Sequence, residues 1–336
     1  MLKSLMNRIG SRWNQQRLDR CRRRALVAPL LMLLLLPAAA DESLPADASL
    51  PVVATFSILG DLTETIGGAR VTVRTLVGPG GDAHVYTPTP ADARQLGEAQ
   101  LLIVNGLGFE GWMDRLVEAA GYGGPIVVAT DGVAPRRTED GGTDPHAWQD
   151  PANGRRYIEN IRDGLVAVDP DGAAGYRERA AQLLADLDGV AARMSESLAA
   201  IPVERRRVVT SHDAFGYFGD AFDIDFIAPV GTSTESEASA ADVAALVRQI
   251  RREQIPAVFV ENISDPRLLE QIRRETGAQL GGTLYSDALS SSDGPAATYL
   301  DMLTYNTTTL AAALATAAAD IGVEPPAPAT SHGDPK

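Results

Sequence analysis

The sequence predicts an α/β fold made of two doubly wound parallel-sheet lobes that are joined by one long helix. Short β-branched runs alternate with helical patterns in the first half of the chain. One long amphipathic stretch follows, and the alternation then restarts in the second half. Alternation of this kind places the strands in a parallel sheet with helices on its faces.

Four apolar runs of the first half predict strands, and the segments between them predict helices. Gly67 and Gly68 end the first predicted helix. Asp150 followed by Pro151 favours the start of another, because Asp caps a helix and Pro fits its first turn. The predicted strands cover residues 52–56, 71–77, 101–105 and 126–129, and the predicted helices cover 61–66, 90–99, 111–120 and 151–168.

Residues 171–200 predict one continuous helix. Its apolar residues step by three or four positions and therefore share a face. At about 1.5 Å per residue the helix extends roughly 45 Å, which is enough to run along two lobes. The residues on this face are Tyr176, Ala180, Leu183, Leu187, Val190, Met194, Leu198 and Ile201.

The second half repeats the strand–helix rhythm of the first. Its predicted strands cover residues 208–211, 226–230, 257–260 and 278–284, and its predicted helices cover 238–254, 266–276 and 296–321. We therefore expect an N-terminal lobe at 41–169, a connecting helix at 170–203, a C-terminal lobe at 204–321 and a disordered, Pro-rich tail at 322–336.

The first forty residues have the layout of a signal peptide. A basic segment ends at Arg24, an apolar run covers residues 25–37, and three alanines precede Asp41. The run is shorter than the ~20 residues that span a membrane, so we expect cleavage after Ala40 rather than a membrane anchor. Cys21 precedes the run, whereas the lipid-attachment cysteine of a lipoprotein follows it. Export through either the Sec or the twin-arginine route fits these residues.

Charge and cysteine content exclude several kinds of partner and site. The net charge is −14, and because residues 1–24 contain eight Lys or Arg and one Asp, the remainder carries −21. Such an acidic surface disfavours binding to nucleic acid. Cys21 is the only cysteine, so the expected mature chain has neither a disulfide nor a thiolate metal site.

Three histidines occupy equivalent places in the two halves. His84, His146 and His212 each follow a predicted strand, whereas the fourth histidine, His332, lies in the expected tail. In open α/β sheets, ligands bind beyond the carboxyl ends of the strands. The three imidazoles therefore predict a metal site in the cleft between the lobes.

Two carboxylates are candidates for a fourth ligand. Glu261 and Asp287 both follow predicted strands of the second half, and a carboxylate completes a tetrahedral zinc site. Glu261 could instead accept hydrogen bonds at the lobe interface, and Asp287 could cap a helix or a turn. The residue pattern leaves this choice open.

The residue pattern also leaves open whether the small, polar loop 231–240 is an ordinary connection or a mobile flap over the cleft.

A series of motifs extends over nearly the whole mature chain, in the order VVATFSILGDLTETIGG, GDAHVYTPTPADARQL, NGLGFEGW, DPHAWQDP, SHDAFGYF, GTSTESEASAADV and LYSDAL. This series resembles the metal-specific periplasmic solute-binding proteins of bacterial ABC importers, the zinc and manganese group called cluster A-I. The ligands of that family lie in four of these motifs, which implies His84, His146, His212 and Asp287 as the metal ligands. The resemblance thus selects Asp287 over Glu261.

The sequence departs from many zinc-binding members of that group at two points. Many carry a long His-rich insert before the DPH motif, where this chain has RRTEDGGTD, and some carry a cysteine pair that is absent here. These departures place the chain in the subgroup that lacks the His-rich insert. Some members of that subgroup are thought to receive zinc from a periplasmic chaperone, which makes such a chaperone a candidate partner.

The resemblance implies a protein that captures one Zn²⁺ per chain with high affinity in the periplasm and delivers it to an ABC permease. It also implies that this protein is a monomer and not an enzyme. Members that import manganese tend to place a carboxylate where this chain has His212, and imidazole suits zinc better than manganese. A manganese-specific protein of the same family is the alternative. A zinc hydrolase with Glu261 as its base is a weaker alternative, because the chain has no HExxH or G-x-S-x-G motif. A cell-surface adhesin is a weaker third alternative, because it needs an exposed binding face that one sequence does not reveal.

Overall fold

The computed structural model describes residues 49–138 and 141–316 of the chain. The predicted signal peptide (1–40) and the predicted tail (322–336) lie outside the described residues. Within the two described ranges, no helix combines the length and the apolarity needed to cross a membrane. The described part has an α/β fold with two parallel sheets, as the sequence predicts.

The first half forms a four-stranded parallel sheet with the strand order β2-β1-β3-β4. Its central strands β1 and β3 are almost wholly buried, which explains their continuous apolar sequences. The strands are β1 (Leu50–Phe56), β2 (Val71–Val77), β3 (Leu101–Val104) and β4 (Ile126–Val128). The helices are α2 (Ser57–Gly67), α3 (Pro90–Glu98), α4 (Met113–Ala120) and α5 (Pro151–Val168), with short 3₁₀ turns η2 (Gly68–Arg70) and η3 (Ala147–Gln149).

The second half repeats this topology with the strand order β6-β5-β7-β8, again entirely parallel. In both sheets the strand order reverses beside the first strand of the half, and ligands bind at such a reversal. The strands are β5 (Arg207–Val209), β6 (Asp225–Ile227), β7 (Ala257–Glu261) and β8 (Gln279–Leu284). The helices are α7 (Gly216–Phe222), α8 (Ala240–Glu253), α9 (Arg267–Thr276) and α10 (Tyr299–Thr316).

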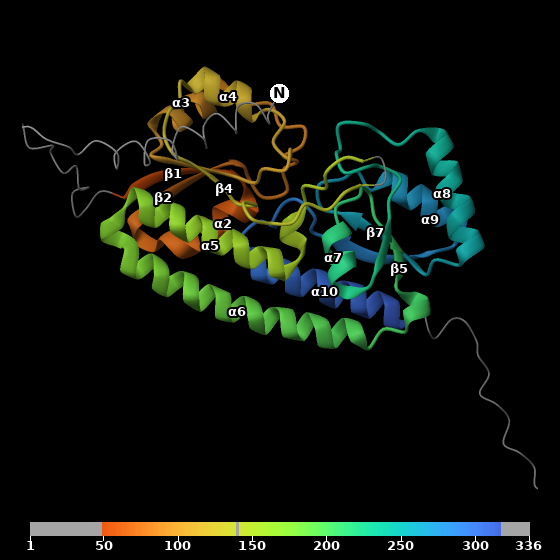
Figure 1. Cartoon of the computed structure of the whole chain (residues 1–336). Helices are drawn as coiled ribbons and strands as arrows, with labels where there is room; N and C mark the ends of the chain where they lie inside the picture. The colour runs from red at the N-terminus through yellow and green to blue at the C-terminus, as the bar shows by residue number, and fades with distance from the viewer. Residues whose placement is uncertain (1–48, 139–140, 317–336) are drawn as a thin grey trace, which may run out of the picture. The chain divides into compact units, whose positions relative to one another are not determined.

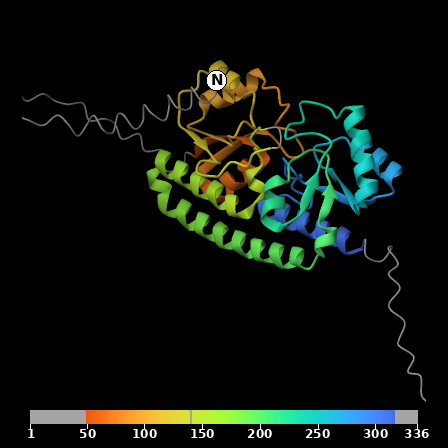
Figure 2. The same cartoon turned by 45° about the vertical axis from the view of Figure 1, so that its right-hand side comes forward.

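The long helix α6 (Ala173–Ala199) connects the two lobes, between the 3₁₀ turns η4 (Pro170–Gly172) and η5 (Val203–Arg205). It contacts α2 and α5 of the first half and α10 and α7 of the second. Figures 1 and 2 show it running along the same side of both lobes. All of the residues predicted to share its inner face are buried, so the helical periodicity identified this face correctly.

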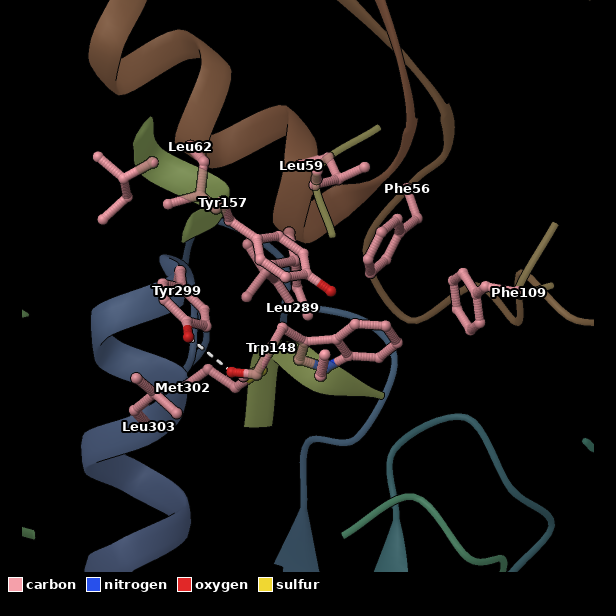
Figure 3. Packing of buried hydrophobic residues seen from close by; sticks show 14 of the residues in the cluster. Phe56, Leu59, Leu62, Phe109, Trp148, Tyr157, Leu289, Tyr299, Met302 and Leu303 are labelled. Atoms are coloured by element: carbon pink, nitrogen blue, oxygen red, sulfur yellow. Dashed lines mark hydrogen bonds between the residues drawn. The ribbon is translucent and has the colours of Figure 1, made fainter. Parts of the chain in front are cut away.

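One hydrophobic core extends through both lobes, and a smaller second core lies in the outer layer of the second lobe. The large core includes residues of both sheets together with α2, α5, α6 and α10. Figure 3 shows part of it, with Phe56 beside Trp148 and with the hydroxyl of Tyr299 donating a hydrogen bond to the carbonyl oxygen of Trp148. The second core joins one face of β5 and β7 to α8 and α9.

The predicted elements match the structure except at one place. All eight predicted strands and all eight predicted helices are present. The predicted bounds of β2 and α5 are those of the structure, whereas the other elements have shifted ends, and the end of the last predicted helix lies outside the described residues. The sequence analysis missed α7. This helix has the sequence GYFGDAF, and its two glycines and short length obscure a helical pattern.

Candidate metal centre

Four buried side chains from four separate loops converge at one point. His84, His146, His212 and Asp287 each offer one ligand atom, and these atoms all lie within 4.8 Å of one another. They follow β2, β4, β5 and β8, respectively, so every one lies beyond the carboxyl end of a strand. The structure therefore brings together the three histidines that the sequence pattern predicted and Asp287, which the resemblance implied as the fourth ligand.

The imidazole Nε2 atoms face the carboxylate of Asp287. Nε2 of His84 and Nε2 of His212 each lie 3.2 Å from its Oδ2, and Nε2 of His146 lies 3.6 Å from Oδ1. The Nε2 atoms of His84 and His146 are themselves 3.2 Å apart. Two carboxylate oxygens and three ring nitrogens thus surround one small volume.

The chemistry of this donor set fits a divalent cation. Both carboxylate oxygens of Asp287 are buried, and neither accepts a hydrogen bond of good geometry from the described residues. A buried carboxylate without hydrogen bonds is costly, and coordination of a metal satisfies it. Three imidazoles and one carboxylate form a four-ligand set that suits tetrahedral zinc.

Asp144 orients His146. Its Oδ1 lies 2.8 Å from Nδ1 of the ring and also accepts the backbone N–H of His146. With its proton held on Nδ1, the ring directs its Nε2 lone pair toward the centre. The other oxygen of Asp144 pairs with Arg136 at 3.3 Å, and Arg136 in turn pairs with Asp220 on α7.

Glu261 occupies the corresponding position behind His212. Its Oε2 lies 2.6 Å from Nδ1 of that ring, in a direction that makes the contact an ion pair rather than a well-aligned hydrogen bond. Its Oε1 accepts the backbone N–H groups of Ser211 and His212. Glu261 therefore supports a histidine, whereas Asp287 faces all three Nε2 atoms. This geometry favours Asp287 in the choice that the residue pattern left open.

Burial and charge act in opposite directions on Asp287 and His212. Burial would raise the pKa of Asp287, but the imidazoles of His212 and His146 hold this pKa well below its usual range. Burial would lower the pKa of His212, but the carboxylates of Glu261 and Asp287 hold it well above its usual range. Because only the neutral imidazole coordinates a metal, cations and protons therefore compete for His212.

The segment that carries Asp287 is held by the first lobe. The carbonyl oxygen of Ser286 accepts hydrogen bonds from Nε1 of Trp148 and Nε2 of Gln149. The amide of Leu289 donates to Oγ of Ser57, and its carbonyl oxygen accepts from the amide of Gly80. Although Asp287 follows a strand of the second sheet, its loop is therefore fixed to the loops of the first.

Aromatic rings form the apolar wall of the centre. The ring of Phe109 packs edge-on against His84, and Trp148 packs edge-on against His146. Phe56 contacts both Phe109 and Trp148, as Figure 3 shows. This wall excludes water from one side of the ligand group and thereby strengthens electrostatic interactions within it.

A buried network explains the NGLGFEGW motif. Glu110 accepts hydrogen bonds from the hydroxyl of Thr55 and the backbone amides of Asn105 and Gly106. The side chain of Asn105 then donates to the carbonyl oxygen of Pro145, next to His146. Burial raises the pKa of Glu110. The motif therefore fixes the loop that carries one of the imidazoles.

The sequence analysis missed the supporting roles of Asp82 and Asp144. Both belong to a D-x-H pattern that occurs twice, in DAH and DPH, and in both the Asp Oδ1 accepts the backbone N–H of the histidine two residues later. This short repeat was the signal that could have identified them, because Asp commonly bonds the backbone two residues on.

Comparisons with known proteins agree with this geometry. A family model described as ZnuA, zinc-uptake complex component A periplasmic, matches residues 52–313. The chain is 35% identical over 265 residues to the manganese-binding lipoprotein MntA of Halalkalibacterium halodurans, an alignment that covers 79% of this chain and 88% of MntA. It is 34% identical over 280 residues to the iron-binding protein YfeA of Yersinia pestis, with 82% and 90% covered.

The fold is similar to a solved two-lobe structure. The periplasmic zinc-binding protein TroA from Treponema pallidum superimposes with a TM-score of 0.77 at 31% identity, covering 80% of this chain and 99% of TroA. These relatives are named for manganese, iron and zinc. Their similarity therefore bears on the fold and on metal binding, and leaves the choice of metal to the chemistry of the site.

Proposed function

The chain belongs to the family of periplasmic zinc-uptake complex components, and from this premise we propose that it captures one Zn²⁺ between its lobes and delivers it to an ABC permease for import. As a member of this family it is a metal-binding, substrate-binding protein of an ABC importer. The proposal includes zinc as the metal and the periplasm as the location of the protein. It also includes the ligand set, which is His84, His146, His212 and Asp287.

The observation that carries the proposal is the convergence of three Nε2 atoms on the buried carboxylate of Asp287. Imidazole nitrogen suits zinc, whereas carboxylate and water oxygens suit manganese. With three nitrogens and one carboxylate, the donor set favours Zn²⁺ over Mn²⁺. Selectivity against Cu²⁺ then depends on a near-tetrahedral geometry and on metal availability, since Cu²⁺ generally binds more tightly to nitrogen ligands.

A manganese-binding protein remains the alternative within the family, because relatives with 35% and 30% identity are named for manganese. A hydrolase is disfavoured by the surroundings of Glu261. Both of its oxygens are engaged, by two backbone amides and by Nδ1 of His212, so it is not available as a general base for a metal-bound water. A partnership with a periplasmic zinc chaperone, and the monomeric state, stay predictions of the resemblance.

The metal content of the mature protein tests this proposal. The protein is purified at neutral pH and its metal is measured by elemental analysis and native mass spectrometry. We expect one zinc per chain. Titration of the metal-free protein against a competing chelator should give tight Zn²⁺ binding and Mn²⁺ binding weaker by several orders of magnitude. Comparable affinities for the two metals would overturn zinc specificity while leaving metal import intact.

A growth assay tests the transport role. Deletion of the gene should impair growth when zinc is chelated, and zinc but not manganese should restore it. A plasmid that encodes the wild-type chain should rescue the deletion strain, whereas one that encodes the Asp287→Ala variant should not. Rescue by the variant would argue against delivery of metal from this site.

A further inference from the structure

Asp82 makes one hydrogen bond to the metal-site loop and another to the opposite lobe. Its Oδ1 accepts the backbone N–H of His84 at 2.9 Å. Its Oδ2 accepts the hydroxyl of Thr234 at 2.6 Å, although Thr234 lies 152 residues further along the chain. Thr234 belongs to the loop 231–239, which is part of the connection between β6 and α8 in the second lobe. One carboxylate thus joins this loop to a predicted ligand.

The two D-x-H segments use their aspartates differently. In the second segment, Oδ1 of Asp144 holds both the backbone N–H and Nδ1 of His146. In the first segment, Oδ1 of Asp82 accepts a hydrogen bond only from the backbone N–H of His84, and Oδ2 accepts one from the hydroxyl of Thr234. The hydrogen bond between Asp82 and the His84 backbone is therefore linked, through the same carboxylate, to the position of a loop from the other lobe.

Among the three histidines of the site, His84 depends most on its backbone hydrogen bond for its orientation. Nδ1 of His146 and Nδ1 of His212 each lie next to a carboxylate, but within the described ranges no carboxylate contacts Nδ1 of His84. His84 is also the most exposed of the four residues, at 6% against 0–1% for the others. Its orientation depends on its backbone hydrogen bond and on the edge contact with Phe109.

On these grounds we propose that Asp82 is a positioning residue that couples the loop 231–239 to His84, so that the Asp82–Thr234 hydrogen bond slows the escape of bound metal. The inference rests on the proposed function, because it concerns release from the same site. When Thr234 moves away with its loop, Asp82 loses one partner and His84 becomes easier to displace. When the loop returns, the charged acceptor again fixes the His84 backbone.

The test compares two threonines of one loop. Thr234→Val removes the donor while it keeps the side-chain shape. Thr232→Val is the matched control, because Thr232 is similarly half-buried and its hydroxyl makes no hydrogen bond with the described residues. The rate of Zn²⁺ loss to excess chelator is followed by stopped flow. We expect Thr234→Val to lose zinc about ten- to a hundredfold faster, the effect of one hydrogen bond to a charged group, and Thr232→Val to match the wild type.

A double-mutant cycle tests the coupling itself. Asp82→Ala should speed zinc loss more than Thr234→Val, and adding Thr234→Val to Asp82→Ala should cause no further increase. Independent, multiplicative effects would overturn the coupling. Equal release rates for Thr234→Val and Thr232→Val would overturn the role of the Asp82–Thr234 contact.

A metal-free measurement separates this inference from the proposed function. If the wild-type chain binds no zinc, the proposed function fails, but hydrogen exchange of the apo protein still tests the coupling. Thr234→Val should speed exchange of the His84 amide, which donates to Asp82, while Thr232→Val should not. Unchanged exchange in Thr234→Val would overturn the inference whatever metal the protein binds.

Discussion

Oε2 of Glu261 lies 2.6 Å from Nδ1 of His212, on the opposite edge of the imidazole from the Nε2 atom that faces Asp287. A carboxylate in this position makes the imidazole a better metal ligand, but it also makes it a better base. Zinc and protons therefore compete for the same ring, and the competition gives the site a specific dependence on pH.

The first prediction concerns the ligand set. Replacing His84, His146 or His212 by Ala removes one donor and should weaken Zn²⁺ binding by more than about a hundredfold, which is the upper range for loss of a supporting residue. Asp287→Ala should also be severe, because Glu261 is engaged by His212 and by two backbone amides and cannot easily replace it.

Chelator competition measures these affinities. Asp114→Ala, which removes an exposed carboxylate on α4, is the control and should bind zinc like the wild type. Wild-type affinity in His212→Ala would refute the ligand assignment.

The second prediction concerns pH and Glu261. The carboxylates of Glu261 and Asp287 outweigh burial and raise the pKa of His212 well above its usual 6.5, so protons compete with zinc for this ring at a higher pH than for an ordinary imidazole. Zinc affinity should fall by about tenfold for each pH unit below that pKa, as one proton is displaced per ion. Glu261→Gln should weaken zinc binding by roughly 10–100-fold at high pH.

The difference in zinc affinity between the wild type and Glu261→Gln should become smaller at acid pH. The variant lowers the pKa of His212 as well as its affinity for zinc, so it suffers less from proton competition at low pH. Calorimetry in buffers with different ionisation enthalpies should also show proton release at neutral pH. A constant gap between pH 8 and pH 5, with no proton release, would contradict this account.

The third prediction concerns the stability of the contact between α2 and α10. Oδ2 of Asp61 accepts the backbone N–H of Tyr299 at 2.8 Å, and burial raises the pKa of Asp61 from 3.8 to about 6. Above pH 6 the carboxylate is charged in both folded and unfolded states, so its desolvation destabilises the fold by at most about 3 kcal/mol. As pH falls from 6 to 3.8 the folded state takes up the proton and this cost disappears.

Asp61→Asn should therefore stabilise the protein at pH 7, because the amide oxygen can still accept the Tyr299 N–H. The stability difference between the variant and the wild type should vanish below about pH 4, where the wild-type carboxyl is neutral. Urea unfolding of the metal-free proteins at both pH values measures it. A variant less stable than the wild type at pH 7 would show that the charge contributes favourably.

The last prediction concerns metal choice. His212→Glu gives two nitrogens and two carboxylates, a harder donor set that suits Mn²⁺ better. The ratio of zinc to manganese affinity should fall by at least about tenfold relative to the wild type. Because the new carboxylate would lie near Glu261, the double variant His212→Glu, Glu261→Gln separates charge repulsion from donor chemistry. An unchanged ratio in both variants would mean that His212 does not set the selectivity.

Local sequence patterns determined much of the architecture. The strand–helix alternation predicted both sheets, and the spacing of apolar residues from Tyr176 to Leu198 identified the buried face of α6. Both signals are local, because burial of one helix face or one strand imposes a period on the residues themselves. The same logic placed His84, His146 and His212 beyond the ends of strands.

Only the tertiary structure decided what these side chains meet. The pattern could not choose between Asp287 and Glu261, because both lie at the carboxyl ends of parallel strands of one sheet. Their positions on opposite edges of the His212 ring make the distinction. It could not show that the Asp287 loop is fixed to Trp148, or that Asp82 reaches Thr234. These contacts join residues more than 130 positions apart, and their geometry depends on how the two lobes pack, which no local period of the sequence encodes.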